Sequence, residues 1–204
     1  MVLKMPTGRL ILASGSKTRK RMLQNAGVVF DVVPARIDEE SLKASLIASG
    51  VSPRDIADAL ADAKARSVSM LNPGKLIIGA DQVLVCDSGI LSKAAGVEDA
   101  KETLQRLSGC MHQLHSAAVI YEDGQPIWRA LDVATMHMRP LSDKFIDDYL
   151  ETLGEDAFWS VGAYQLEGLG AQLFNKIAGD YFTILGLPLI SVLDFLRRRE
   201  ILNQ

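Results

Sequence analysis

The sequence predicts an α/β protein built around a mixed, twisted β-sheet that is flanked by helices. In the first half of the chain, short apolar runs rich in β-branched residues alternate with segments of helical periodicity, as in parallel strands joined by helices. In the middle, approximately residues 87–140, long apolar runs separated by glycine turns favour antiparallel hairpins. We expect a single domain over residues 1–204, in which this hairpin-rich region forms one of two lobes around a cleft.

The first half of the chain contains the alternating elements. A strand at residues 9–13 leads into a helix that ends before Gly27, a residue suited to the position after a helix. A second strand is expected at residues 28–35, followed by a short acidic loop at residues 36–41. The next helix begins at Pro53, because proline is favoured in the first turn of a helix.

The second half is predicted by the same signals. A long strand at residues 75–87 ends in a turn at residues 87–89, and Ser142 is a strong helix N-cap. A turn at residues 186–188 leads into an amphipathic C-terminal helix. The other expected elements are strands at residues 90–94, 112–123 and 126–140 and helices at residues 97–109 and 142–154.

Composition excludes several classes of protein. The 204 residues are 48% hydrophobic and 23% charged, as in ordinary globular proteins, and the net charge of −3 gives no general field for a nucleic-acid polymer. No apolar stretch is long enough to span a membrane. Cys86 and Cys110 form neither a CxxC pair nor a zinc spacing, and with no signal peptide they predict a cytoplasmic protein with reduced thiols. A disulfide between them is the less favoured alternative.

The segment LILASGSKTRKRML, residues 10–23, changes character halfway along. An apolar strand ends in Ser14-Gly15-Ser16, and the helix that follows carries Lys17, Arg19, Lys20 and Arg21. Unpaired backbone N–H groups and the helix dipole favour an anion there, and Arg19 can hold a phosphate with two N–H groups. Neither a P-loop nor a dinucleotide fingerprint is present. The alternative is a capped helix with a solvated basic face.

Acidic residues form the second group of candidates. Asp81 interrupts a buried strand, and an unpaired buried carboxylate is costly, so it needs a cation, a metal or hydrogen-bond donors. Asp81 can be a metal ligand or the base for a water, whereas a bend at Gly79 would leave it on the surface. The acidic segment around Glu39 suits a hard cation such as Mg²⁺, although acidic turns are often simply solvated.

Lysines and histidines complete the candidates. Lys64 lies on an otherwise small and apolar helix, and Lys93 follows a strand; each alone is typical of a surface residue. His112 and His115 fall on opposite faces of one strand and are predicted to be structural. Cations for phosphates and carboxylates for a metal, without a Ser-His-Asp or Cys-His set, indicate metal-assisted attack on the phosphates of a nucleotide.

Seven segments occur in this order: LILASGSKTRKRML, IDEE, ALADAKA, IIGADQVL, ILSKA, LSGCMHQLHSAAVI and GAYQLEGLGAQLFNKIAGDYFTILGLPL. Together they resemble the Maf family of nucleoside triphosphate pyrophosphatases, from Leu10 through the terminal helix. The resemblance implies a fold of the inosine triphosphate pyrophosphatase (Ham1) type, a divalent metal (Mg²⁺ or Mn²⁺), a homodimer, and hydrolysis of a nucleoside triphosphate to monophosphate and diphosphate in nucleotide-pool cleaning. The alternative is a nucleotide-binding regulator of cell division and septum formation in which hydrolysis is incidental.

The resemblance also implies roles for individual residues. Ser14, Ser16 and Arg19 would bind phosphate, Asp81, Lys64 and Lys93 would be catalytic, and Glu39 and Asp81 would bind the metal. Two segments depart from the family pattern. Lys17 and Lys20 stand where the first loop usually has proline and arginine, and Arg21 is expected to matter little. Ser92 and Ala94 replace the glycine and proline around Lys93, which predicts a looser turn.

Three residues bear on the nucleobase. Gln82 after the catalytic aspartate and Glu167 in a Glu-Gly-x-Gly segment are similar to the branch acting on 7-methyl-GTP, rather than on dTTP and UTP. A carboxylate at 167 would accept from the N1–H and N2–H edge of guanine and attract a cationic, N7-methylated base. Gln82 should point away from the face that bears Asp81 and shape the pocket wall. Thr18, another expected substrate contact, stands where that branch tends to carry an aromatic residue, so one stacking contact is missing.

Overall fold

The computed structural model describes residues 9–87 and 89–203. In this part of the chain the strands are β1 (Leu10–Leu12), β2 (Asp31–Val32), β3 (Leu76–Cys86), β4 (Gly89–Leu91), β5 (Met111–Glu122), β6 (Gln125–Met138) and β7 (Phe174–Ala178). They form one sheet in the order β2-β1-β3-β5-β6-β7, with β4 also paired to β3. β1 is parallel to β2 and β3, and the other pairs are antiparallel. The predicted mixed sheet is therefore confirmed.

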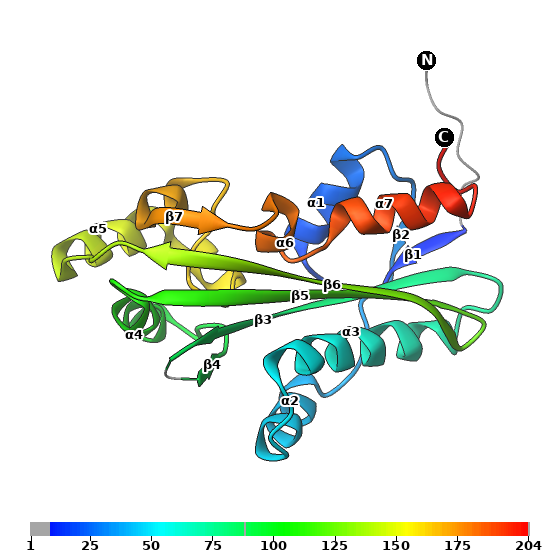
Figure 1. Ribbon diagram of the computed structural model, residues 1–204, viewed down its shortest axis with the longest axis horizontal. Helices are drawn as coiled ribbons and strands as arrows, with labels where there is room; N and C mark the ends of the chain where they lie inside the picture. Colours follow the sequence, from blue (N-terminus) through cyan, green and yellow to red (C-terminus); the bar gives the residue numbers. More distant parts are fainter. Residues whose placement is uncertain (1–8, 88, 204) are drawn as a thin grey trace.

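Helices flank this sheet, as expected. They are α1 (Lys17–Asn25), α2 (Glu39–Ala48), α3 (Pro53–Ser69), α4 (Val97–Leu107), α5 (Asp143–Leu153), α6 (Tyr181–Ile184) and α7 (Leu189–Arg198), with 3₁₀ segments η1 (Gly154–Trp159) and η2 (Leu169–Leu173). Figure 1 shows α2 and α3 on one face of the sheet and α1, α6 and α7 on the other, with α4 and α5 toward one end. Among the described residues, no helix combines the length and the apolar character that crossing a membrane would need.

Two predicted elements differ in the structure. The strand expected at residues 28–35 is reduced to β2, because its parallel neighbour β1 is itself only three residues long and offers few partners. The acidic loop expected at residues 36–41 is wrong, since α2 begins at Glu39. The side chain of Asp38 caps this helix by accepting a hydrogen bond from the backbone N–H of Ser41 at 3.0 Å.

Several other expectations concern the middle of the chain. In the turn expected at residues 87–89, Ser88 lies outside the described residues, as do residues 1–8 and 204 of the expected domain. The two long strands β5 and β6 of the hairpin-rich region run the length of the sheet, so this region contributes to both ends of the molecule (Figure 1). The division into two lobes stays a prediction. Cys86 and Cys110 are present as thiols rather than as a disulfide.

The edge of β3 is interrupted. β5 pairs with one edge of β3 along its whole length, from Leu76 to Cys86. On the opposite edge, β1 pairs with residues 76–78 and β4 pairs with residues 84–86, so residues 79–83 lie between these two neighbours. This opening lies at the carboxyl end of β1, where the chain turns into α1, and such positions commonly hold ligands in α/β sheets. The sheet therefore presents Asp81 at a natural site.

Candidate active site

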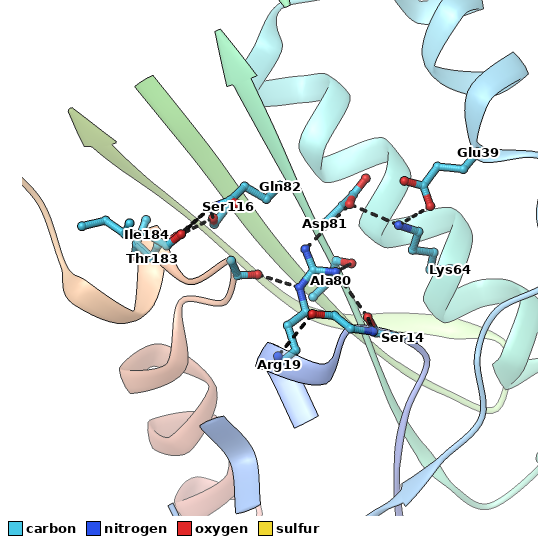
Figure 2. A network of polar contacts seen from close by, with 12 residues as sticks. Ser14, Arg19, Glu39, Lys64, Ala80, Asp81, Gln82, Ser116, Thr183 and Ile184 are labelled. Atoms are coloured by element: carbon cyan, nitrogen blue, oxygen red, sulfur yellow. Dashed lines mark hydrogen bonds and ion pairs between the residues drawn. The ribbon is translucent and has the colours of Figure 1, made fainter. Parts of the chain in front are cut away.

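Asp81 lies in the opening at the edge of β3 (Figure 2). Its side chain is only 8% exposed, so the alternative of a surface aspartate is wrong. Lys64 Nζ lies 3.1 Å from Oδ1 of Asp81, and Arg19 Nη2 lies 3.7 Å from the same oxygen. These two cations offset the cost of burying the carboxylate.

Lys64 reaches Asp81 because α3 packs very closely on β3. Gly79 lies two residues before Asp81 and faces the backbone of α3, where an added Cβ would lie 2.2 Å from the carbonyl oxygen of Ala61. Lys64, one turn further along α3, is buried, and its Nζ also lies 2.5 Å from Oε2 of Glu39. One ammonium therefore joins two carboxylates, and Lys64 is not a surface residue.

Arg19 is buried in the first turns of α1, and its guanidinium is largely engaged by the protein. Nε donates to the carbonyl of Gly186 at 2.8 Å, and Nη1 donates to the carbonyl of Ala80 at 2.9 Å and to Oγ of Ser14 at 3.3 Å (Figure 2). Ala80 lies in the opening, so Arg19 supplies a donor that a neighbouring strand would otherwise provide. Burial lowers the pKa of Arg19, and the nearby carboxylates oppose that shift. The expected phosphate contact of Arg19 stays a prediction.

The first loop uses its hydroxyl groups to shape the backbone. Ser14 Oγ accepts from the N–H of Ser16 at 3.2 Å, and Ser16 Oγ accepts from the N–H of Arg19 at 3.3 Å, which caps α1. Thr18 is half-buried beside them. The helix start predicted from Ser-Gly-Ser is thus present, and it opens onto a cleft.

The cleft has a volume of about 350 Å³ and is lined by residues that are far apart in the sequence. It brings together all the predicted site residues, namely Ser14, Ser16, Thr18, Arg19, Glu39, Lys64, Asp81, Gln82, Lys93 and Glu167. Burial lowers the pKa of Lys93, and the neighbouring cations Arg19 and Lys64 lower it further.

Two lining residues were missed from the sequence. Lys43 lies one turn after Glu39 on α2, so recognising Asp38 as a helix cap would have placed both on the same side of a helix. Trp159, at the end of η1, is 54% exposed and has Lys17 Nζ 4.3 Å from its ring centroid. No periodic pattern surrounds Trp159, so nothing in the sequence singled it out. Its exposed ring adds an aromatic surface to a cleft in which Thr18 had left that contact missing.

Gln82 points to the other face of the sheet from Asp81, as strand alternation predicts. Its Nε2 lies 3.0 Å from Oγ of Ser116 and from the carbonyl oxygens of Thr183 and Ile184 (Figure 2). These contacts fix α6 to the sheet beside the turn that accepts from Arg19. Gln82 therefore shapes the cleft wall by holding a neighbouring element.

Glu167 is paired with Arg21, a contact that the sequence did not indicate. Arg21 Nη2 lies 2.5 Å from Oε1 of Glu167, with the arginine side chain 56% exposed and the glutamate side chain 19% exposed. Ion pairs this exposed contribute about 0–1 kcal/mol. The Glu167 carboxylate can therefore exchange this partner for a ligand at little cost.

The carboxylates of the cleft fit a divalent metal only in part. Among the described residues, no group of three or more His, Cys, Asp or Glu side chains could hold a metal ion by itself. Asp81 and Glu39 nevertheless converge on one cationic group, the ammonium of Lys64. Two carboxylates fit Mg²⁺, which is usually held by one or two carboxylates together with substrate phosphates and water.

The histidines have structural surroundings. His112 is buried, and its Nε2 lies 2.7 Å from the hydroxyl of Tyr164. Burial lowers the pKa of His112 to about 4, so the imidazole is neutral at neutral pH. His115 is half-buried, and its Nε2 contacts Oε1 of Gln113 at 3.2 Å.

Comparison with known proteins agrees with this geometry. A nucleoside triphosphate pyrophosphatase of Caulobacter vibrioides is 53% identical over 186 residues, covering 91% of this chain and 93% of that protein. A 7-methyl-GTP pyrophosphatase of Mesorhizobium japonicum is 52% identical over 191 residues, covering 94% and 96%. A solved HAM1 protein from Coxiella burnetii shows a partial likeness, with a TM-score of 0.40 and 14% identity over 63% of this chain and 72% of that one. The family model for Maf-like proteins matches residues 9–199, and the chain belongs to this family.

Proposed function

We propose that this chain is a nucleoside triphosphate pyrophosphatase, which hydrolyses the anhydride between the α and β phosphates and releases a monophosphate and diphosphate. The observation that carries the proposal is a buried carboxylate, Asp81, held between Lys64 and Arg19 in an open cleft. The activity named for relatives at 52% and 53% identity supports it.

The charges of the cleft suit a polyphosphate. Four cationic side chains line it, Arg19, Lys43, Lys64 and Lys93, together with the carboxylates of Glu39, Glu40 and Asp81. These carboxylates offset most of the positive charge, so the protein alone balances only part of the charge of a triphosphate. A bound divalent cation would provide the remainder.

Glu39 and Asp81 would hold that cation, Mg²⁺ or Mn²⁺. When bound, it would neutralise phosphate oxygens and polarise the reacting phosphoryl group. Lys64 and Arg19 both contact Oδ1 of Asp81, which leaves Oδ2 for the metal or for the attacking water. The same two cations hold the carboxylate in place before substrate binds, so little reorganisation is needed during the reaction.

The preferred base is proposed to be a purine, with 7-methylguanine the first candidate. Glu167 at the cleft can accept from the N1–H and N2–H groups of guanine, and Trp159 offers a ring on which a base can stack. A relative at 52% identity is named a 7-methyl-GTP pyrophosphatase, which supports this choice. The homodimer and the cytoplasmic location implied by the family resemblance remain predictions.

The test is a panel of canonical and modified nucleoside triphosphates with Mg²⁺, scored for diphosphate against orthophosphate. Diphosphate release that stops in excess EDTA is expected, and orthophosphate as the sole product would contradict the proposal. Asp81→Asn should reduce turnover by about 10²–10⁴-fold while nucleotide binding persists. Asp148→Asn, on the exposed face of α5, is the matched control. A nucleotide-binding regulator would instead keep its function in the Asp81 variant.

A further inference from the structure

The helix α2 lies beside the cleft with few apolar anchors. In α2, all of whose residues the structure describes, none is buried. Its half-buried Leu42 and Leu46 pack against the apolar cluster formed by α3 and the sheet. Segments with little apolar burial open locally at low free-energy cost. The position of α2 over the cleft therefore depends on its polar contacts.

Two polar contacts connect α2 to the rest of the site. Glu39 contacts Lys64 at one end, as described above. Lys43 makes the second contact: its Nζ lies 3.0 Å from the carbonyl oxygen of Leu91 and 3.1 Å from Oγ of Ser92. These two residues lie at the end of β4, immediately before Lys93. One ammonium thus joins the helix that carries Glu39 to the segment that carries Lys93.

The surroundings of Lys43 keep its charge directed at this junction. The side chain is half-buried, and burial lowers the pKa of Lys43. Asp81, Glu39 and Glu40 oppose this shift because their charges favour the ammonium form. A charged donor in such surroundings forms stronger hydrogen bonds than a fully solvated lysine would.

We propose that Lys43 is a positioning residue that clamps α2 to the end of β4 and thereby fixes the separation of Glu39 and Lys93 across the cleft. It acts through its hydrogen bonds to Leu91 and Ser92. Its effect on turnover rests on the proposed function, whereas the clamp itself does not.

The clamp is tested by hydrogen exchange of the intact protein. In Lys43→Met, which keeps the aliphatic stem, amides of α2 and of residues 89–95 should exchange at least about tenfold faster, as the loss of a charge-assisted hydrogen bond predicts. Lys43→Arg, which retains a cationic donor, should restore most of the protection. Lys144→Met removes an exposed lysine from α5 and is the matched control. Unchanged exchange in both segments of Lys43→Met would overturn the proposal.

Kinetics then distinguish a clamp from a direct substrate contact. Ser92→Ala should lower kcat/KM less than Lys43→Met does, and the double variant should be no worse than Lys43→Met alone, because both changes break the same link. Independent effects that multiply in the double variant would overturn the clamp and make Lys43 a substrate-binding residue. A wild-type protein that releases no diphosphate from any triphosphate would refute the proposed function, while the exchange experiment would still decide the clamp.

Discussion

Arg19 and Arg21 lie two residues apart on α1, and the structure predicts opposite consequences for their replacement. Methionine at either position keeps an apolar stem and removes the guanidinium. At position 19, two buried main-chain carbonyls, those of Gly186 and Ala80, lose a charged donor, and Asp81 loses a neighbouring cation. A hydrogen bond to a charged group contributes about 1.5–3 kcal/mol, so Arg19→Met should lower the free energy of unfolding by about 3–5 kcal/mol.

At position 21 only the exposed ion pair with Glu167 is lost. Arg21→Met should therefore change the free energy of unfolding by no more than about 1 kcal/mol. Urea unfolding of the two variants, followed by circular dichroism, measures both values. The dependence of the unfolding free energy on urea should stay the same, because neither change alters the surface that unfolding exposes.

If the two variants differ by less than about 1 kcal/mol, the guanidinium of Arg19 does not hold the edge of β3, and the reasoning is refuted. The comparison also controls the interpretation of activity. A loss of turnover in Arg19→Met can be assigned to a lost phosphate contact only at a urea concentration where the variant remains folded. Arg19→Lys keeps the charge without the planar fork, and turnover measured alongside its stability separates the two roles.

Three further predictions concern other parts of the site. Gly79→Ala should destabilise the protein by at least about 2 kcal/mol in urea unfolding, because the new Cβ meets backbone of α3; an unchanged midpoint would contradict this. His112 has a folded pKa of about 4 against 6.5 unfolded, so the stability it contributes is complete above pH 6.5 and falls by about 3 kcal/mol as pH drops toward 4. His112→Gln should flatten that part of the stability–pH profile, and an equally steep profile would exclude this histidine as its source. Glu167→Gln should reduce the preference for 7-methyl-GTP over dTTP in kcat/KM, whereas a wild-type enzyme fastest on dTTP or UTP would show that the argument from Glu167 is wrong.

The parts of the site that the sequence predicted have local signals. Ser14 and Ser16 end an apolar strand, and Asp81 interrupts a buried one, so each is conspicuous beside its own neighbours. The buried aspartate required a cation, and the structure supplies Lys64 and Arg19. A single window of sequence was enough to identify these positions, although not to pair them.

The parts that were missed depend on distant contacts. α2 has no buried face that would produce a clear apolar period in its described residues, so its helix was mistaken for a loop and Lys43 was overlooked. Arg21 and Glu167 are far apart in the chain, and a contact of that kind leaves no pattern near either residue. The length of β2 was overestimated because it is limited by the short neighbour β1 rather than by its own β-branched residues.

The opening between β1 and β4 links the stability of the fold to the chemistry of the site. A continuous strand there would satisfy the carbonyl of Ala80 but would cover the edge on which Asp81 lies. Arg19 resolves this conflict, because one guanidinium donates to Ala80 and places Nη2 beside Asp81. The charge that faces the reacting carboxylate is therefore fixed by folding, before any substrate enters. Variants that loosen Arg19 should for this reason lose stability and turnover together, whereas variants of Lys93, on the exposed side of the cleft, should lose turnover alone.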